Sequence, residues 1–369
     1  MKLNKLVIYI VSISLISVLM IGCANNAKPM DKNESADLQD DNIQIDNDYD
    51  AFENLPTYER ESDDAEELAD EQDEQTASMK QPESANGNIG KRVICYGDSL
   101  TEGTGGNGVT WPGTVEAISG ATVLNYGVFG EASSCIAARQ GGNPQYLNDD
   151  IVVPADCTPV HAQVSGKYGW EMLLVFGDAG INNCSIGGIE GTYFMDDDGN
   201  RMFTRLAPGE EKAFPAGTPF LTHAMMDKQP DDIMVIYAGS NDTLETLDDI
   251  PVLVQKIKEM VDYHENDKYV VVSLTSRHSR IPIVDDVNKA LEKEFGKHYL
   301  NLRQFMVYES LDQLGIAPTD HDKDAISKGD VPFSIRLSED EEENHGNSDF
   351  YRLVGEQIYK KLVELGYLD

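Results

Sequence analysis

Residues 91–103 of the chain read KRVICYGDSLTEG. The apolar run in this stretch, Val93 to Tyr96, has the composition of a β-strand and ends abruptly in Gly97-Asp98-Ser99. A strand that ends in this way would present the Ser99 hydroxyl in the crevice where open α/β sheets bind their ligands. Gly, Asp and Ser are also common in ordinary turns, so the role of this serine depends on partners elsewhere in the chain.

Further strands and helices alternate along the chain. Apolar runs typical of buried strands occupy residues 122–126, 233–238, 269–274 and, more briefly, 299–302. Helical spacing of apolar residues predicts helices over 111–118, 251–264, 285–295, 305–314 and 350–365. Strands that alternate with helices favour a parallel sheet covered on both faces. We therefore expect an α/β fold, a flavodoxin-like three-layer αβα sandwich.

The segment 143–230 breaks this alternation. It has few helical windows, many glycines and short strand-like runs such as 202–206, so we interpret it as an all-β insertion. Its aspartate cluster at 196–200 is interpreted as a solvated hairpin turn, because it lacks the twelve-residue spacing and distal Glu of an EF-hand calcium loop. Cys157 and Cys184 both fall in this segment and could form a disulfide or stay free.

The first 22 residues have the features of a secretory leader. A short basic start precedes an apolar run from Leu6 to Ile21, which is shorter than the roughly 20 residues that a bilayer span needs. The run ends in Gly22-Cys23 and resembles a bacterial lipobox, in which the cysteine is acylated. That resemblance implies a lipoprotein signal peptide over 1–22, a lipid on Cys23, and a location at the cell surface, on the outer face of the bacterial cytoplasmic membrane. A plain secretory signal with an incidental cysteine is the alternative.

Residues 23–90 are expected to form a disordered acidic tether. Between positions 24 and 90 the chain holds 20 Asp and Glu residues against 4 Lys and Arg residues, and its few apolar residues show no sustained periodicity. Such a segment cannot bury enough surface to offset its chain entropy. The folded domain is therefore expected to cover 91–369.

The overall charge excludes several classes of partner. The 369 residues carry a formal charge of −36 at pH 7. Nucleic-acid binding needs a basic surface, so nucleic acid is not an expected partner, and anionic membrane surfaces should repel the chain. Contact with a membrane is expected through the N-terminal lipid only. The five cysteines show no CxxC spacing, so they suggest neither a zinc site nor a redox motif. No metal site and no cofactor are expected.

Three polar strand ends should meet at one edge of the predicted sheet. Besides Ser99 they are Gly130, just beyond the strand at 122–126, and Asn241, just beyond the strand at 233–238. Attack of a serine on an ester develops negative charge on the carbonyl oxygen, which preorganised N–H donors stabilise. The backbone N–H groups of Ser99 and Gly130 and the side-chain amide of Asn241 would supply three such donors.

A serine hydroxyl also needs a base, because it is a poor nucleophile at neutral pH. Of the seven histidines, His345 lies just before the last predicted helix, three residues after Glu342. A carboxylate so placed can orient the ring of the histidine. His278, which follows the strand at 269–274, is the reserve candidate.

Four blocks of this sequence resemble those of the GDSL, or SGNH, serine hydrolases. They are GDSL at 97–100, NYGVFG at 125–130, GSND at 239–242, and HGN at 345–347 with Tyr351 six residues beyond the histidine. The resemblance covers roughly 91–142 and 231–369, and excludes the tether and the insertion.

The resemblance implies a role for each residue. Ser99 is the nucleophile, Gly130 and Asn241 complete the oxyanion hole with the N–H of Ser99, and His345 acts as general base and then as general acid. The family usually has Asp three residues before this histidine. Here that position is Glu342, in an acidic run that is longer than usual, and Asp340 is the alternative third member of the triad.

The function implied is that of a carboxylic-ester hydrolase. The expected substrates are short acyl esters, above all O-acetyl groups on carbohydrate, or another small ester. The predicted surface location and the inserted β-module favour a glycan. A lipase or lysophospholipase of the same fold is one alternative. A non-catalytic, glycan-binding surface lipoprotein is the other, and the altered acidic run before His345 supports it.

Overall fold

The computed structural model describes residues 85–168, 174–175, 177–275 and 278–369. The predicted signal peptide, Cys23 and nearly all of the predicted tether lie outside these residues. The chain divides into the units Met1–Lys80 and Gln81–Asp369, and every described residue belongs to the second. Across the described part of the chain, no helix has the length and apolar character that a membrane crossing requires.

The described residues of this unit contain a five-stranded parallel sheet. Its strands are β1 (Arg92–Gly97), β2 (Thr122–Gly127), β12 (Ile233–Tyr237), β13 (Tyr269–Val272) and β14 (Tyr299–Leu300). They lie in the order β14-β13-β12-β1-β2, and every pair is parallel. This is the strand order of the flavodoxin-like fold, read from its fifth strand to its second. The predicted α/β fold is confirmed.

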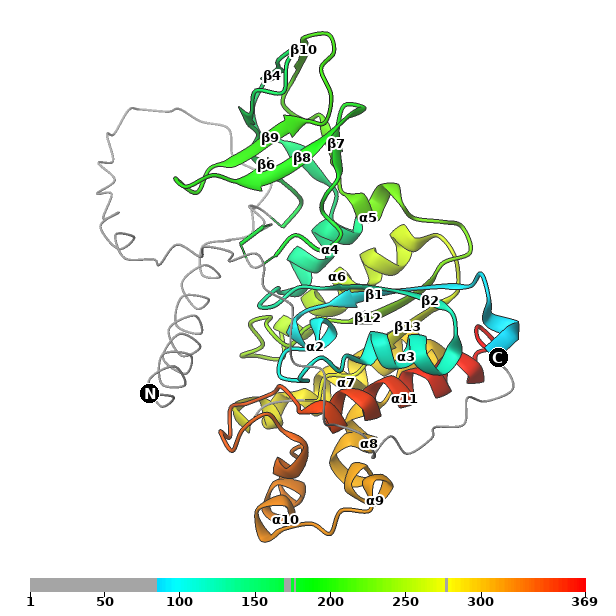
Figure 1. The fold of residues 1–369 in the computed structure, drawn as a ribbon. Coiled ribbons are helices and arrows are strands. Elements are labelled where there is room, and N and C mark those ends of the chain that lie inside the picture. The colour runs from blue at the N-terminus through cyan, green and yellow to red at the C-terminus, as the bar shows by residue number, and fades with distance from the viewer. Residues whose placement is uncertain (1–84, 169–173, 176, 276–277) are drawn as a thin grey trace, which may run out of the picture. The chain divides into compact units, whose positions relative to one another are not determined.

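Helices cover both faces of the sheet (Figure 1). One face carries α3 (Trp111–Ser119), α8 (Leu302–Tyr308) and α11 (Ser348–Glu364), and the other carries α4 (Ser133–Gln140), α6 (Asp249–His264) and α7 (Ile281–Phe295). Side chains alternate along β1, so that Val93 and Cys95 enter the first core while Ile94 and Tyr96 enter the second. Burial on both sides explains the unbroken apolar run of this strand.

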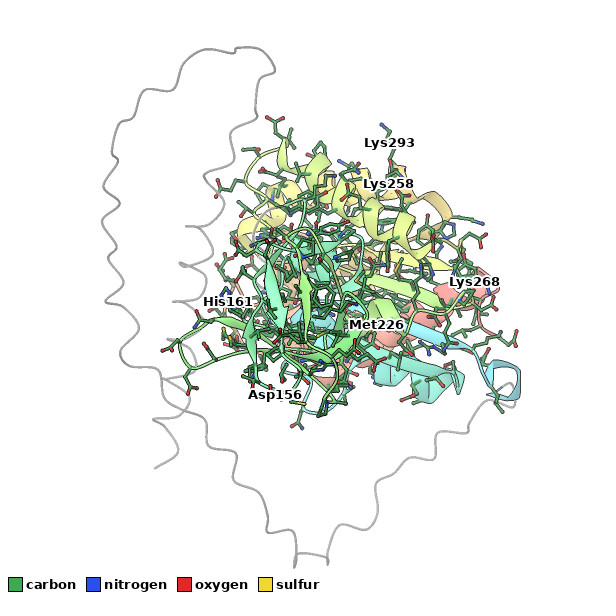
Figure 2. The ribbon with its side chains drawn as sticks, turned by 90° about the horizontal axis from the view of Figure 1, so that it is seen from above. Asp156, His161, Met226, Lys258, Lys268 and Lys293 are labelled. Atoms are coloured by element: carbon green, nitrogen blue, oxygen red, sulfur yellow. The ribbon has the colours of Figure 1, made fainter. Side chains whose placement is uncertain are left out.

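Shorter helices complete the layers. The α-helical turns are α2 (Ser99–Glu102), α5 (His223–Met226), α9 (Ser310–Leu314) and α10 (Asp320–Ser327), and the 3-10 turns are η1 (Ala85–Asn88), η2 (His278–Arg280), η3 (Gly296–His298) and η4 (Phe333–Ile335). The sequence did not predict α10, which has few apolar residues and begins at a capping box formed by Thr319 and Asp322. Figure 2 shows Lys258 of α6 and Lys293 of α7 on one side of the molecule, away from Asp156 and His161 of the insertion.

The strand at 122–126 is less buried than its composition predicted. It forms β2, which is the last strand in the sheet order and pairs with β1 alone. Most of its residues are half-buried or exposed. The apolar run therefore marks an edge strand here, and composition alone does not separate an edge strand from a central one.

The segment 143–230 forms the expected β-rich insertion, which has a small core of its own. Among the described residues, the strands β5-β9-β8-β7-β11-β3-β6 form one antiparallel sheet and β10-β4 form another. Their bounds are β3 Gln145–Leu147, β4 Ile151–Val153, β5 Val160–His161, β6 Val164–Ser165, β7 Cys184–Ile186, β8 Ile189–Met195, β9 Arg201–Arg205, β10 Lys212–Phe214 and β11 Pro219–Leu221.

The aspartate cluster is the hairpin turn that the sequence predicted. It joins β8 to β9, and the carboxylate of Asp196 accepts hydrogen bonds from the N–H groups of Asp198 and Asn200 at 3.1 and 2.8 Å. These contacts are those of a side chain that closes its own turn.

The cysteines of the insertion do not form a disulfide. Cys157 is exposed, whereas Cys184 is buried in the core of the insertion, with its Sγ 3.3 Å from the carbonyl oxygen of Gly191. One thiol faces solvent and the other faces the core, which is why they do not pair. Burial raises the pKa of Cys184 to about 12. Cys95 is a buried free thiol, as predicted.

The folded domain begins a few residues before the predicted boundary at 91. The side chain of Asn88 is fully buried, and its amide donates to the carbonyl oxygens of Ser119 at 3.1 Å and Asp369 at 3.2 Å. Its Oδ1 accepts the N–H of Asp369 at 2.9 Å. Asn88 thus fastens the start of the domain to its last residue.

Replacement of this side chain tests the boundary. Asn88→Ala should lower the free energy of unfolding by about 1–3 kcal/mol, because it removes the buried hydrogen bond to the carbonyl oxygen of Ser119 and the part-buried one from the N–H of Asp369. Urea denaturation followed by circular dichroism measures the change. Ile89→Ala is the matched control, since the neighbouring Ile89 is exposed and should be nearly neutral. Equal effects of the two substitutions would place the boundary back at 91.

Candidate active site

Ser99 opens the helical turn α2, directly after β1. The carboxylate of Asp98 caps this turn by accepting the N–H of Leu100 at 2.9 Å. The turn packs on the end of β2, where a Cβ on Gly127 would clash with the backbone of Glu102. The absence of a side chain at Gly127 therefore allows α2 to approach the sheet and fixes the place of Ser99.

The structure places His345 against Ser99. The ring nitrogen Nε2 lies 2.8 Å from the Oγ of Ser99, although the two residues are 246 positions apart. The ring of Phe129 stacks on His345 at 6.2 Å between centroids and 16° between planes. Two contacts with residues 336–337 hold the loop that carries His345. The N–H of Leu337 donates to the carbonyl oxygen of His345, and Arg336 forms a β-bridge with Gly346.

The carboxylate that orients His345 is that of Glu343. Its Oε1 lies 2.6 Å from Nδ1 of the ring and also accepts the backbone N–H of His345 at 2.9 Å. Burial raises the pKa of Glu343, but the hydrogen bonds and the charge of His345 outweigh it and hold the pKa below its usual value. An ionised carboxylate can only accept, so Nδ1 carries the proton and Nε2 is free to accept one from the Ser99 hydroxyl.

The two carboxylates predicted for this position lie elsewhere. Glu342 accepts hydrogen bonds from the N–H and the hydroxyl of Ser279 at 3.1 and 2.6 Å, and Asp340 accepts the N–H of Glu342 at 2.9 Å. A turn in which the N–H of Glu343 donates to the carbonyl oxygen of Asp340 directs Glu342 outward. The longer Glu side chain can then reach the ring from two residues before the histidine. The spacing rule of three residues missed it for that reason.

The structure brings the strand ends at Gly130 and Asn241 together. Gly130 lies in the turn after β2 with φ of 73°, a left-handed conformation that favours glycine. The side-chain amide of Asn241, after β12, donates to the carbonyl oxygen of Glu131 at 3.1 Å. An amide group carries two N–H donors, and this bond uses one of them.

Asp242 holds the loop that carries Asn241. It is buried and accepts hydrogen bonds from the N–H and the hydroxyl of Ser133 at 2.8 and 2.5 Å. Lys256 of α6 forms an ion pair with it at 3.1 Å. These bonds join the end of β12 to the start of α4 and to α6, so the loop is anchored on two helices.

The same part of the domain contains a pocket that is open to solvent, and the empty space of about 310 Å³ within it includes some of that solvent. It is lined by Ser240, Leu244, Leu274, Arg280, Ile283, Val284 and Asn344. Two of the lining residues are chain neighbours of functional groups, since Ser240 precedes Asn241 and Asn344 precedes His345. The guanidinium of Arg280 donates to the carbonyl oxygens of Gly239 and Asp242 at 3.3 and 2.6 Å, which steadies its rim.

The reserve histidine takes no part in this arrangement as far as the described contacts go. The backbone N–H of His278 donates to the carbonyl oxygen of Glu341 at 3.3 Å, while the ring bonded to Ser99 is that of His345. Over the described ranges, no cluster of three or more His, Cys, Asp or Glu side chains is arranged to hold a metal ion.

Among the comparisons with known proteins, the one with solved structures found matches. No family model matches the chain, and no curated protein does. The chain is similar to a lipolytic protein of the G-D-S-L family from Desulfitobacterium hafniense DCB-2, with 14% identity and a TM-score of 0.36 over 74% of this chain and 99% of that one. A member of the same family from Veillonella parvula DSM 2008 shares 14% identity at a TM-score of 0.33, over 74% of this chain and 97% of that one.

A third similar structure is described as a peptidoglycan O-acetylesterase. It shares 12% identity at a TM-score of 0.31, over 76% of this chain and 93% of that one. At these identities and TM-scores the similarities assign no activity to this chain, whose function has to be inferred from the geometry of its own site.

Proposed function

We propose that this protein is a serine esterase that hydrolyses short acyl esters of carbohydrate through an acyl-enzyme on Ser99. The observation that carries the proposal is the continuous chain of contacts from Glu343 to His345 at 2.6 Å and from His345 to Ser99 at 2.8 Å. A nucleophile, a base and a carboxylate that orients the base are the elements that acyl transfer by serine requires.

The proposed reaction has two steps. Nε2 of His345 takes the hydroxyl proton of Ser99 while its Oγ attacks the ester carbonyl, and the N–H groups of Ser99 and Gly130 and the amide of Asn241 bind the resulting oxyanion. Collapse of this intermediate breaks the bond to the alcohol, which leaves with the proton from His345. A water then attacks the acyl-enzyme, gives a proton to His345 and releases the acid, and that proton returns to Ser99. Glu343 keeps the ring in the tautomer that this cycle needs.

The pocket supports a short acyl group. Four of its lining side chains are aliphatic, namely Leu244, Leu274, Ile283 and Val284. In an acylated carbohydrate the acyl group is the apolar half and the sugar is the polar half, so the acyl group is the part that this lining would favour.

The location at the cell surface is part of the same proposal. It depends on the leader at 1–22 and on acylation of Cys23, and a surface enzyme would meet cell-wall or extracellular glycans. Metabolic labelling with palmitate in a bacterial host should mark the wild type and leave Cys23→Ser unmarked. Unlabelled wild type in the membrane-free fraction would remove the lipid anchor from the proposal.

The triad predicts distinct effects for three substitutions. Ser99→Ala should abolish hydrolysis of p-nitrophenyl acetate. Glu343→Gln should lower kcat by roughly 10²–10⁴-fold, because an amide no longer fixes the tautomer of His345. Glu342→Gln is the matched control from the adjacent position, and should change kcat by less than about twofold, since its carboxylate contacts Ser279 instead.

Two outcomes would contradict this assignment. A larger loss in Glu342→Gln than in Glu343→Gln would return the third position of the triad to Glu342. Equal inactivity of the wild type and Ser99→Ala, together with retained binding to acetylated glycans, would favour the non-catalytic glycan-binding protein.

The acyl pocket predicts a change in chain-length preference. Ile283→Phe should reduce hydrolysis of p-nitrophenyl butyrate relative to the acetate by roughly tenfold, because the larger ring fills space that the extra methylenes need. Steady-state kinetics on both esters measures the ratio. Val252→Phe on α6 is the control, because Val252 is exposed and does not line the pocket. An unchanged ratio in Ile283→Phe would assign the pocket to another part of the substrate.

A further inference from the structure

Arg139 is a buried arginine that the triad and its donors do not explain. It lies on α4 with no exposed surface, and its Nη2 forms an ion pair at 2.6 Å with the carboxylate of Glu131, which is 2% exposed. The Nε of Arg139 lies 3.3 and 3.1 Å from the two oxygens of the same carboxylate. Burial of such a pair costs free energy unless further hydrogen bonds satisfy both groups, so its remaining partners indicate what it is for.

The other N–H groups of Arg139 reach three separate segments of backbone. Nη1 donates to the carbonyl oxygens of Tyr126 at 2.7 Å and Ala179 at 3.2 Å, and Nη2 donates to that of Gly97 at 3.3 Å. Gly97 is the last residue of β1, Tyr126 lies at the end of β2, and Ala179 belongs to the insertion. One guanidinium group therefore joins the ends of two neighbouring strands.

Each of the three proposed oxyanion donors is close, in the chain or through one hydrogen bond, to a residue that Arg139 contacts. Gly97 stands two residues before Ser99, and its carbonyl oxygen also accepts the N–H of Val128 at 3.1 Å. Glu131 directly follows Gly130. The carbonyl oxygen of Glu131 accepts the amide of Asn241 at 3.1 Å, so the residue paired with Arg139 is also the one that orients the third donor.

We propose that Arg139, acting through Glu131, is a positioning residue that holds the three oxyanion donors in register. The proposal rests on the esterase function proposed for this site. An oxyanion hole lowers the barrier only when its donors are fixed before the reaction, since donors that must reorient during the reaction lose much of their effect. Arg139 touches none of the reacting groups in this arrangement and contributes through the backbone that it fixes.

The insertion completes the surroundings of Arg139. The carbonyl oxygen of Ala179 takes one of its N–H groups, and the hydroxyl of Thr222 donates to the backbone carbonyl oxygen of Arg139 at 2.7 Å. Both contacts come from the 143–230 segment, one from its middle and one from its end. The insertion therefore supports the backbone of the proposed oxyanion hole, in addition to any role in binding substrate.

Substitution of both members of the pair tests the proposal. Arg139→Lys keeps the charge but loses the planar fork, and Glu131→Gln keeps the shape but loses the ion pair. In each variant, kcat for p-nitrophenyl acetate should fall about 100-fold while KM stays within about threefold, as expected for an interaction made in the transition state. Affinity for an alkylboronic acid, which forms a tetrahedral adduct on serine, should fall by a similar factor.

Arg92→Lys is the matched control. Arg92 lies at the opposite end of β1 and pairs with Asp232 at 3.0 Å and Asp227 at 2.7 Å. The same substitution there disturbs the ion pairs of an arginine that is partly buried and distant from Ser99. Arg92→Lys should lower the melting temperature and leave kcat and boronate affinity unchanged. All assays are run well below the melting temperature of each variant.

The outcomes separate this inference from the proposed function. If the wild type hydrolyses the ester and binds the boronate, but Arg139→Lys and Glu131→Gln keep both properties or lose them no more than Arg92→Lys does, the positioning role is wrong. If the wild type itself neither hydrolyses the ester nor binds the boronate, the esterase proposal fails, and with it the reason for an oxyanion hole.

Discussion

The pairing of β1 with β2 and β12 is the constraint on which the site depends. In this parallel register Gly97 lies opposite Gly127 on one side and Tyr237 on the other, so three strands end level with one another. The residues that follow these ends then share one edge of the sheet, as the carboxyl ends of parallel strands do. A side chain at Gly97 would clash with Thr101 and with the Tyr237 backbone. The glycine therefore lets β12 pack beside β1, and it also leaves room for the turn that carries Ser99.

The parts of this arrangement that the sequence predicted are those that depend on local composition. Strands buried on both faces read as continuous Val and Ile runs, and their ends are marked by Gly, Asp, Ser and Asn, so the sheet and the residues at its edge could be inferred. Composition failed where tertiary position decides: β2 has the same type of run but lies at the edge of the sheet. The sequence left the pairing of Cys157 and Cys184 open, because their positions in the chain do not indicate that one thiol faces solvent and the other faces the core.

The partner of His345 shows a second limit of the sequence. Several consecutive carboxylates precede this histidine, and each has the chemistry to orient an imidazole. The choice among them depends on the turn that directs Glu342 outward. Ser279, from another loop, donates to the carboxylate of Glu342, and Glu343 reaches the ring. Ser279 is distant in sequence and belongs to η2, so no spacing rule within the loop could have included it. Such a choice is made by packing between two loops, and it can differ between chains with the same motif.

The partners of Arg139, like the partner of His345, are set by packing between segments that are distant in the chain. In a sequence alone, an arginine is normally interpreted as a solvated residue. The role of Arg139 comes from partners that lie 13, 40 and 42 positions away in the chain. The free-energy cost of its burial has to be offset by all of these bonds together, so loss of one weakens the support for the others. Because one of the bonds ends on Ala179, the stability of the insertion and the geometry of the catalytic edge are linked. A change in the insertion that moves this carbonyl oxygen would therefore shift Arg139 and its partner Glu131. A shift of Glu131 would in turn move Gly130 and Asn241.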